Sequence, residues 1–261
     1  MFFYTNYKFC LARGGYYFNQ RENGFLNLER RLMMSVILKF NGIRPNNEIG
    51  KKQKAYSVLF SFIFGFAAGF IAKILDSTLI PNVISFLGLI GINLGIWIFI
   101  LSLVAAYSYT PKLASARVFT FLISMLFSYY IYTILILNLF PLKYIVFWFL
   151  AAVLSIIPAY IMWFSRADHL ISNIIIALPI SVIAYEGYKI YLSTVEFYGR
   201  YANVENVLVS DGEYFYMLST EIAYALMIII ILVLVPKRKK QCLYILPFSV
   251  AVFFALVAVF P

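Results

Sequence analysis

Seven apolar stretches, separated by proline, charged or polar residues, are the feature that most limits how this chain folds. A helix needs about 20 apolar residues to cross a hydrocarbon core about 30 Å thick, and each stretch reaches or approaches that length. Charged residues make up 12% of the 261 residues, about half their share in a water-soluble domain. The stretches are Tyr56–Leu75, Asn82–Tyr107, Leu113–Leu139, Lys143–Phe164, Leu170–Leu192, Met217–Val235 and Cys242–Phe260.

We therefore predict an all-α fold, a polytopic transmembrane helical bundle with seven spans. An open sheet would leave backbone groups without hydrogen-bond partners in lipid. No stretch alternates apolar and polar residues over about ten positions, as the strands of a membrane barrel do. Two cysteines in the chain exclude a disulfide scaffold.

The placement of lysine and arginine orients the predicted bundle. If the N-terminus is inside, the inner connections and helix ends hold ten of these residues and the outer ones hold four. Cytoplasmic loops carry such an excess, so we predict the N-terminus inside and the C-terminus outside. This topology accounts for the net charge of +10 without a nucleic-acid partner. The inner set is Lys51, Lys52, Lys54, Lys112, Arg117, Arg166, Lys237, Arg238, Lys239 and Lys240.

Residues 1–54 form a basic N-terminal leader before a seven-helix membrane domain at 55–261. The leader lacks the pattern of a secretory signal, and two interpretations of it stay open. In the first, the apolar and basic segment Phe25–Phe40 lies along the inner membrane surface. In the second, the start is misassigned. Glu29-Arg30-Arg31 is what a purine-rich ribosome-binding sequence would encode, and Met33 and Met34 follow it closely, where the true start would lie.

The sequence favours a protein that is not an enzyme. One histidine, His169, excludes a metalloprotease helix with two histidines. Phosphate-binding loops, dinucleotide fingerprints and nucleophile elbows are all missing from the sequence. We expect no catalytic residues, no metal site and no cofactor.

Four charged residues near predicted helix ends form a candidate buried cluster: Lys73, Asp76, Glu186 and Lys189. Ionisable groups inside a membrane usually face the bundle and pair with one another, which suggests a Lys73–Glu186 pair between the first and fifth spans. Each residue could equally pair locally with its neighbour three positions away and extend toward the headgroups. Both interpretations stay open.

Small and polar residues within the spans suggest helix packing and a cavity. Gly65 and Gly69, and likewise Gly91 and Gly95, form stripes that allow close approach of helices. Their usual role is internal packing, and a docking face for another subunit is the alternative. Asn93, Tyr129, Tyr132 and Pro179 are candidates for lining a polar and aromatic cavity at mid-depth.

The charged turn Arg166-Ala167-Asp168-His169 has a structural explanation. Arg166 follows the end of the fourth span, where a cation suits the helix dipole. Asp168 stands where the N-cap of the fifth span is expected. We therefore interpret this turn as a helix cap rather than a functional site.

Five short motifs resemble a bacterial multi-pass integral membrane family catalogued only as a domain of unknown function. The resemblance implies a multi-helix bundle in the bacterial cytoplasmic membrane and no activity that can be carried over. It extends from about Gly65 to the basic run and leaves the leader without a counterpart. The motifs are Gly69–Ser77, Tyr109–Lys112, Tyr129–Tyr132, Ala177–Ile180 and Ala184–Tyr188.

Three functions remain as expectations, and their cavities separate them. A permease-like or ligand-handling bundle, the leading one, predicts a polar cavity that reaches Asn93 or Pro179. A substrate-capture subunit like those of vitamin transporters predicts a closed pocket under residues 193–216 and a small-residue docking face on the first span. A membrane scaffold or accessory subunit predicts a filled core without a ligand-sized pocket, which usually means about 300 Å³ or more. A lipid bilayer is the expected partner in each case, with a further membrane subunit as an open addition.

Overall fold

The computed structural model describes Arg44 and residues 49–75, 91, 93–135, 142–201 and 211–260. The chain divides after Pro45 into two compact units, and the structure below is that of the second. The predicted leader helix at 25–40 lies outside the described residues.

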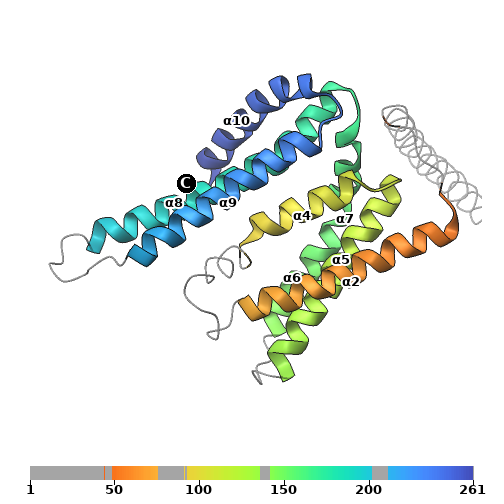
Figure 1. Cartoon of the computed structure of the whole chain (residues 1–261), viewed down its shortest axis with the longest axis horizontal. Helices are drawn as coiled ribbons and strands as arrows, with labels where there is room; N and C mark the ends of the chain where they lie inside the picture. The colour runs from red at the N-terminus through yellow and green to blue at the C-terminus, as the bar shows by residue number, and fades with distance from the viewer. Residues whose placement is uncertain are drawn as a thin grey trace, which may run out of the picture. The chain divides into compact units, whose positions relative to one another are not determined.

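Every regular element in the described ranges is helical, which confirms the all-α prediction (Figure 1). Strands are absent from these ranges. The helices are α2 (Lys51–Leu75), α4 (Leu94–Ala106), α5 (Pro111–Leu135), α6 (Leu142–Leu154), α7 (Ile156–Met162), α8 (Leu170–Tyr201), α9 (Asp211–Leu234) and α10 (Cys242–Val259), with 3-10 turns at Trp163–Arg166 and Lys239–Gln241.

Five segments are long and apolar enough to cross a membrane. The prediction of a helical bundle of the membrane type is therefore supported. The five segments are Lys51–Leu75, Pro111–Leu135, Leu142–Arg166, Leu170–Glu196 and Lys239–Val259. Two further apolar helices, Leu94–Ala106 and Leu218–Leu234, are shorter than a full span. Five of the seven predicted spans thus have spanning length among the described residues.

Within the second predicted span a helix begins at Leu94, so the expectation of one continuous helix through Asn93 is wrong. Asn93 has an extended backbone, with φ −80° and ψ 155°, and is the N-cap residue of α4. An asparagine before an apolar run is a common helix start. The uniformly apolar sequence around it hides that start, because apolar length alone carries no information on where a helix breaks.

The fourth predicted span contains a break near its middle. α6 ends at Leu154, Ser155 forms a turn, and α7 begins at Ile156. Pro158 lacks an N–H, and its ring clashes with the carbonyl four residues earlier, which belongs to Leu154. The proline therefore explains where the span bends.

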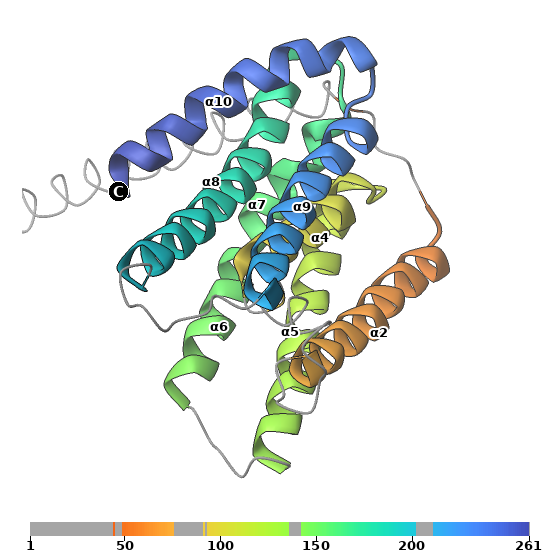
Figure 2. The same cartoon turned by 60° about the vertical axis from the view of Figure 1, so that its left-hand side comes forward.

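α2 and α5 run parallel in a constant register, and the two helices lie against each other in both views (Figures 1 and 2). Ser61 accepts a hydrogen bond from Arg117 at 3.0 Å, and Lys73 contacts Tyr129; both pairs are 56 positions apart. The buried face of α2 consists of Ser61, Gly65 and Gly69. Bulkier side chains on that face would hold the backbones apart.

α8 packs along α10 in the same direction (Figure 2). Near the start of both helices, Gln241 donates a hydrogen bond to the carbonyl of Ala167 at 3.0 Å. Further along, Ser181 donates to the carbonyl of Ser249 at 2.9 Å. α9 lies beside α8 in both views.

Three connections gather at one end of the helices, namely residues 107–110, 163–169 and 235–241. Trp163 donates its indole N–H to the carbonyl of Ser108 at 2.8 Å. The guanidinium of Arg166 lies 4.1 Å from the ring centroid of Tyr107. Asp168 pairs with Arg238 at 2.7 Å. Asp168 thus contacts a residue of the basic run, and its role as the cap of α8 stays a prediction.

Candidate functional site

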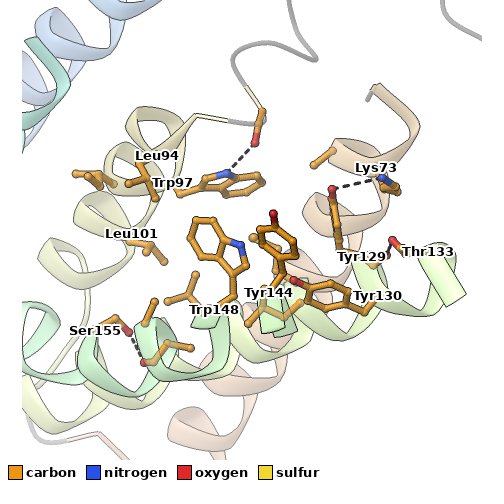
Figure 3. A pocket seen from close by; sticks show the side chains of 18 residues that line it. Lys73, Leu94, Trp97, Leu101, Tyr129, Tyr130, Thr133, Tyr144, Trp148 and Ser155 are labelled. Atoms are coloured by element: carbon orange, nitrogen blue, oxygen red, sulfur yellow. Dashed lines mark hydrogen bonds between the residues drawn. The ribbon is translucent and has the colours of Figure 1, made fainter. Parts of the chain in front are cut away.

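A cavity of about 550 Å³ lies between α2, α4, α5 and α6 (Figure 3). Its walls are mostly aliphatic and aromatic, as in typical ligand sites. The lining residues are Ala72, Lys73, Gly91, Leu94, Trp97, Ile98, Leu101, Leu122, Met125, Leu126, Tyr129, Tyr130, Thr133, Tyr144, Trp148, Ala151, Ala152 and Ser155.

Five aromatic side chains from three helices form much of the wall. Trp97 comes from α4, Tyr129 and Tyr130 from α5, and Tyr144 and Trp148 from α6. The indole N–H of Trp97 donates to the carbonyl of Gly91 at 2.9 Å, which fixes the plane of this ring. Tyr129 and Tyr130 meet edge to face, with 5.5 Å between ring centroids. Rings held in this way present flat apolar surfaces to the cavity.

Lys73 is the charged residue among the described residues of the cavity wall. Its ammonium nitrogen lies 3.4 Å from the hydroxyl of Tyr129 and 4.8 Å from the centroid of that ring. A cation near an aromatic face is attracted by the ring quadrupole. Gly65 of α2 lies against α5, and Lys73 and Tyr129 are each about two helical turns further along. Because the two helices keep the same register, these two residues also meet.

The cavity has a polar end and an apolar end (Figure 3). Lys73, Tyr129 and Thr133 lie toward one side, and Leu101 lies toward the other with Ser155. α5 and α6 run in opposite directions, because Ser115 near the start of α5 donates to the carbonyl of Ile156 just after α6. The lining extends over twelve positions of α5, from Leu122 to Thr133, or about 16 Å of helix.

Glu186 forms a second polar centre, outside the cavity wall. One carboxylate oxygen accepts the backbone N–H of Leu94 at 2.7 Å, and the other accepts the hydroxyl of Tyr224 at 3.0 Å. A carboxylate at a helix N-terminus satisfies a free N–H and interacts favourably with the dipole. Glu186 thus joins α8 to the start of α4 and to α9.

Of the candidate charged cluster, the structure describes contacts of Lys73 and of Glu186. Lys73 contacts Tyr129, whereas Glu186 is bonded to Leu94 and Tyr224, so the structure gives the two residues of the hypothetical interhelical pair different partners. Lys189 is exposed on α8. Asp76 lies outside the described residues, so its pairing with Lys73 is not described.

One of the four residues named for a cavity lines it. Tyr129 is in the wall, whereas Asn93, Tyr132 and Pro179 are not. Pro179 is buried within α8. Tyr132 packs against Phe70 of α2, with 5.9 Å between ring centroids. The cavity therefore lies between α2 and α6 rather than around the proline of α8. It is mostly apolar, so it is not the polar cavity reaching Asn93 or Pro179 that was expected of a permease-like bundle.

The glycines of the two stripes have separate surroundings. Gly65 and Gly69 face the backbone carbonyls of Phe121 and Met125 on α5. Gly91 lines the cavity near Ala72. A Cβ atom on Gly95 would meet the carboxylate of Glu186 at 2.5 Å and the ring of Tyr224 at 2.7 Å. Gly95 thus allows these two side chains to reach the start of α4.

Three aromatic residues of the cavity wall were not predicted from the sequence: Trp97, Tyr144 and Trp148. The chain has three tryptophans, and two of them line this one cavity. Their scarcity among 26 phenylalanines and 21 tyrosines was the available signal, but scarcity does not tell which helix faces turn toward one another.

In the described residues, no three histidine, cysteine or acidic side chains gather as a metal site would require.

Comparison of the chain with models of known protein families, with curated proteins and with solved structures finds no match. The assignment of a function therefore depends on the cavity and its chemistry.

Proposed function

We propose that this protein is a permease-like, ligand-handling membrane bundle that acts without catalysis and takes its ligand in the aromatic cavity. The observation that supports this proposal is the cavity of about 550 Å³ between α2, α4, α5 and α6. Its volume falls within the range of small-molecule sites, about 300–1,000 Å³. The rings of Trp97 and Trp148 suit an apolar ligand body.

Two alternative functions receive less support. A scaffold without a ligand predicts a filled core, whereas this bundle contains a partly open space of ligand size. A substrate-capture subunit predicts a free small-residue face on the first span. Gly65 and Gly69, the centre of that face, lie against α5, so the stripe is already used within the chain.

Quenching of tryptophan fluorescence by an uncharged brominated probe tests the cavity. In nanodiscs, we expect saturable quenching by bromoundecanol that decreases in a variant with both Trp97→Phe and Trp148→Phe, which retains Trp163 alone. Ala151→Phe fills the cavity wall and should weaken binding, while Val153→Phe adds the same bulk at an exposed position of α6. Quenching that rises without saturation, or that Ala151→Phe leaves unchanged, would contradict the proposal.

We also propose the seven-span topology, with the N-terminus inside a bacterial cytoplasmic membrane. Ten basic residues on the proposed inner side support it, as does the gathering of three predicted inner connections at one end of the helices. In a background lacking Cys10 and Cys242, an impermeant maleimide should label Glu205→Cys on intact cells. It should label Lys237→Cys only after permeabilisation. The opposite pattern would overturn this topology.

A further inference from the structure

We infer that the ligand of the cavity is a flat ring compound that carries a carbonyl oxygen, as a quinone does. The ring stacks on the aromatic wall, and the oxygen accepts hydrogen bonds from Trp148 of α6 and Tyr130 of α5. This inference rests on the proposed function, because it names the class of ligand for the same cavity.

The first argument is the flat aromatic surface that the wall offers. Trp97 and Trp148 border the cavity from α4 and α6, and both indoles lie beside the same space (Figure 3). A hydrogen bond to Gly91 holds the plane of Trp97, and Trp148 meets Phe147 of its own helix edge to face, with 5.5 Å between ring centroids. The ring contacts of the described residues do not join the two indoles, which leaves their faces for a ligand. Aromatic faces favour stacking with a flat ring.

The second argument is a pair of hydrogen-bond donors in the wall that have no acceptor in the described part of the chain. They are the indole N–H of Trp148 and the hydroxyl of Tyr130, a side chain that is otherwise buried. The hydroxyls of Thr133 and Ser155 donate instead to carbonyls of their own helices, at 2.9 and 2.6 Å. A polar group away from water is costly unless it is hydrogen-bonded. An acceptor on the ligand therefore stabilises the complex.

The third argument concerns the kind of acceptor. Both donors are neutral, and a ketone oxygen accepts their hydrogen bonds without the large desolvation cost of an ionised group. An alcohol would add an O–H that itself needs an acceptor, and most helix carbonyls are already bonded within their helices. The carbonyl of Gly91 is taken by Trp97. A carbonyl on a flat ring thus satisfies the stacking surface and the donors together.

Two matched ring compounds test this inference in nanodiscs of uncharged lipid. Anthraquinone carries carbonyl oxygens on a fused ring system, and anthracene is the same ring system without them. Binding of each tritiated compound is measured by scintillation proximity, with empty nanodiscs subtracted because both compounds partition into lipid. The variants are Trp148→Phe and Tyr130→Phe, each of which keeps a ring and removes one donor. Tyr132→Phe is the matched control, because that tyrosine packs against Phe70 outside the cavity wall.

We expect the unmodified protein to bind anthraquinone saturably and at least about fivefold more tightly than anthracene, since one neutral hydrogen bond contributes about that factor. Trp148→Phe and Tyr130→Phe should each weaken anthraquinone binding by about fivefold. Their affinity for anthracene should stay within about twofold of the unmodified value, which also reports that the cavity is folded. Tyr132→Phe should match the unmodified protein for both compounds.

Ring carbonyl compounds reach a membrane protein from two sources, as tailed quinones dissolved in the bilayer or as small compounds without a tail. Displacement of tritiated anthraquinone by a benzoquinone with a decyl tail and by tetramethylbenzoquinone separates the sources. Aliphatic side chains of the wall, Ile98 and Leu101 on α4 and Leu122 and Leu126 on α5, offer a surface for a tail. Tighter displacement by the tailed compound, at equal mole fraction in the lipid, assigns the ligand to the bilayer. Equal displacement assigns it to the tailless class.

Three outcomes would overturn this inference: equal affinity for anthraquinone and anthracene, full anthraquinone binding by both Trp148→Phe and Tyr130→Phe, or displacement by neither benzoquinone. Saturable quenching by bromoundecanol would then leave the proposed function standing. Absence of saturable binding of either ring compound, together with absence of saturable quenching by bromoundecanol, would overturn both.

Discussion

Glu186 on α8 accepts the first backbone N–H of α4, that of Leu94, from 92 positions further along the chain. It therefore acts as an N-terminal cap from another helix, while Asn93 occupies the N-cap position without a side-chain capping bond. Tyr224 of α9 donates to the second carboxylate oxygen. The carboxylate of Glu186 thus links α8 to both α4 and α9.

Glu186→Ala should lower the free energy of unfolding by about 2 kcal/mol, because it leaves a helix N–H and a buried hydroxyl without their acceptor. Glu186→Gln retains an oxygen acceptor and should lose less. Thermal unfolding in detergent, followed by circular dichroism, measures both variants. Equal losses for the two variants would show that the acceptor oxygen is not what stabilises the junction.

Gly65→Ala and Gly69→Ala should each destabilise the protein by about 2–3 kcal/mol, since a methyl group there overlaps a backbone carbonyl of α5. Gly91→Ala is the matched control, because among the described residues the nearest atom to an added Cβ is 3.9 Å away. The same unfolding measurement compares the three variants. A loss for Gly91→Ala as large as for Gly65→Ala would contradict the close contact between α2 and α5.

Gln241→Ala should lower the free energy of unfolding more than Asp168→Asn does. Both residues take part in contacts between the start of α8 and the segment before α10. Gln241 is buried, and it bonds to the carbonyl of Ala167 and the N–H of Arg238 at 3.0 Å each, so its loss should cost about 1–3 kcal/mol. The Asp168–Arg238 pair is exposed, with 69% of the Arg238 side chain accessible, and should contribute less than about 1 kcal/mol. Unfolding at low and high salt distinguishes them, because only the ion pair weakens with salt.

Truncation of Trp163 to alanine should lower the free energy of unfolding more than loss of its hydrogen bond alone. The side chain is fully buried and donates to the carbonyl of Ser108. Trp163→Phe should cost about 1–2 kcal/mol, and Trp163→Ala about 3–5 kcal/mol because it also leaves a cavity. Chemical unfolding of the two variants measures the difference. Similar values for both would assign the stabilisation to the hydrogen bond alone.

The helical class was predictable from the sequence, because lipid permits few ways to satisfy a backbone and the apolar stretches have spanning length. Helix breaks were harder to locate. At Asn93 the flanking residues are apolar on both sides, so the hydropathy that identifies the stretch does not show the interruption. At Pro158 the residue type indicates a bend, which the structure places at Ser155.

The candidate site was only partly predictable. Lys73 and Tyr129 each stand out by residue type, but the sequence does not state that they meet, because that depends on the register between α2 and α5. The side chains of Trp97 and Trp148 come from helices whose facing sides are set by packing in three dimensions. Hydropathy patterns locate spans and carry no such angular information when a helix is apolar on all sides.

The constant offset of 56 positions between α2 and α5 limits which changes in chain length this protein tolerates. One residue inserted between Ser61 and Lys73 turns everything beyond it by about 100° around the helix axis, which moves the lysine away from Tyr129. The same insertion in the connections that separate the two helices leaves both faces as they are. Length variation among natural relatives should therefore be confined to those connections.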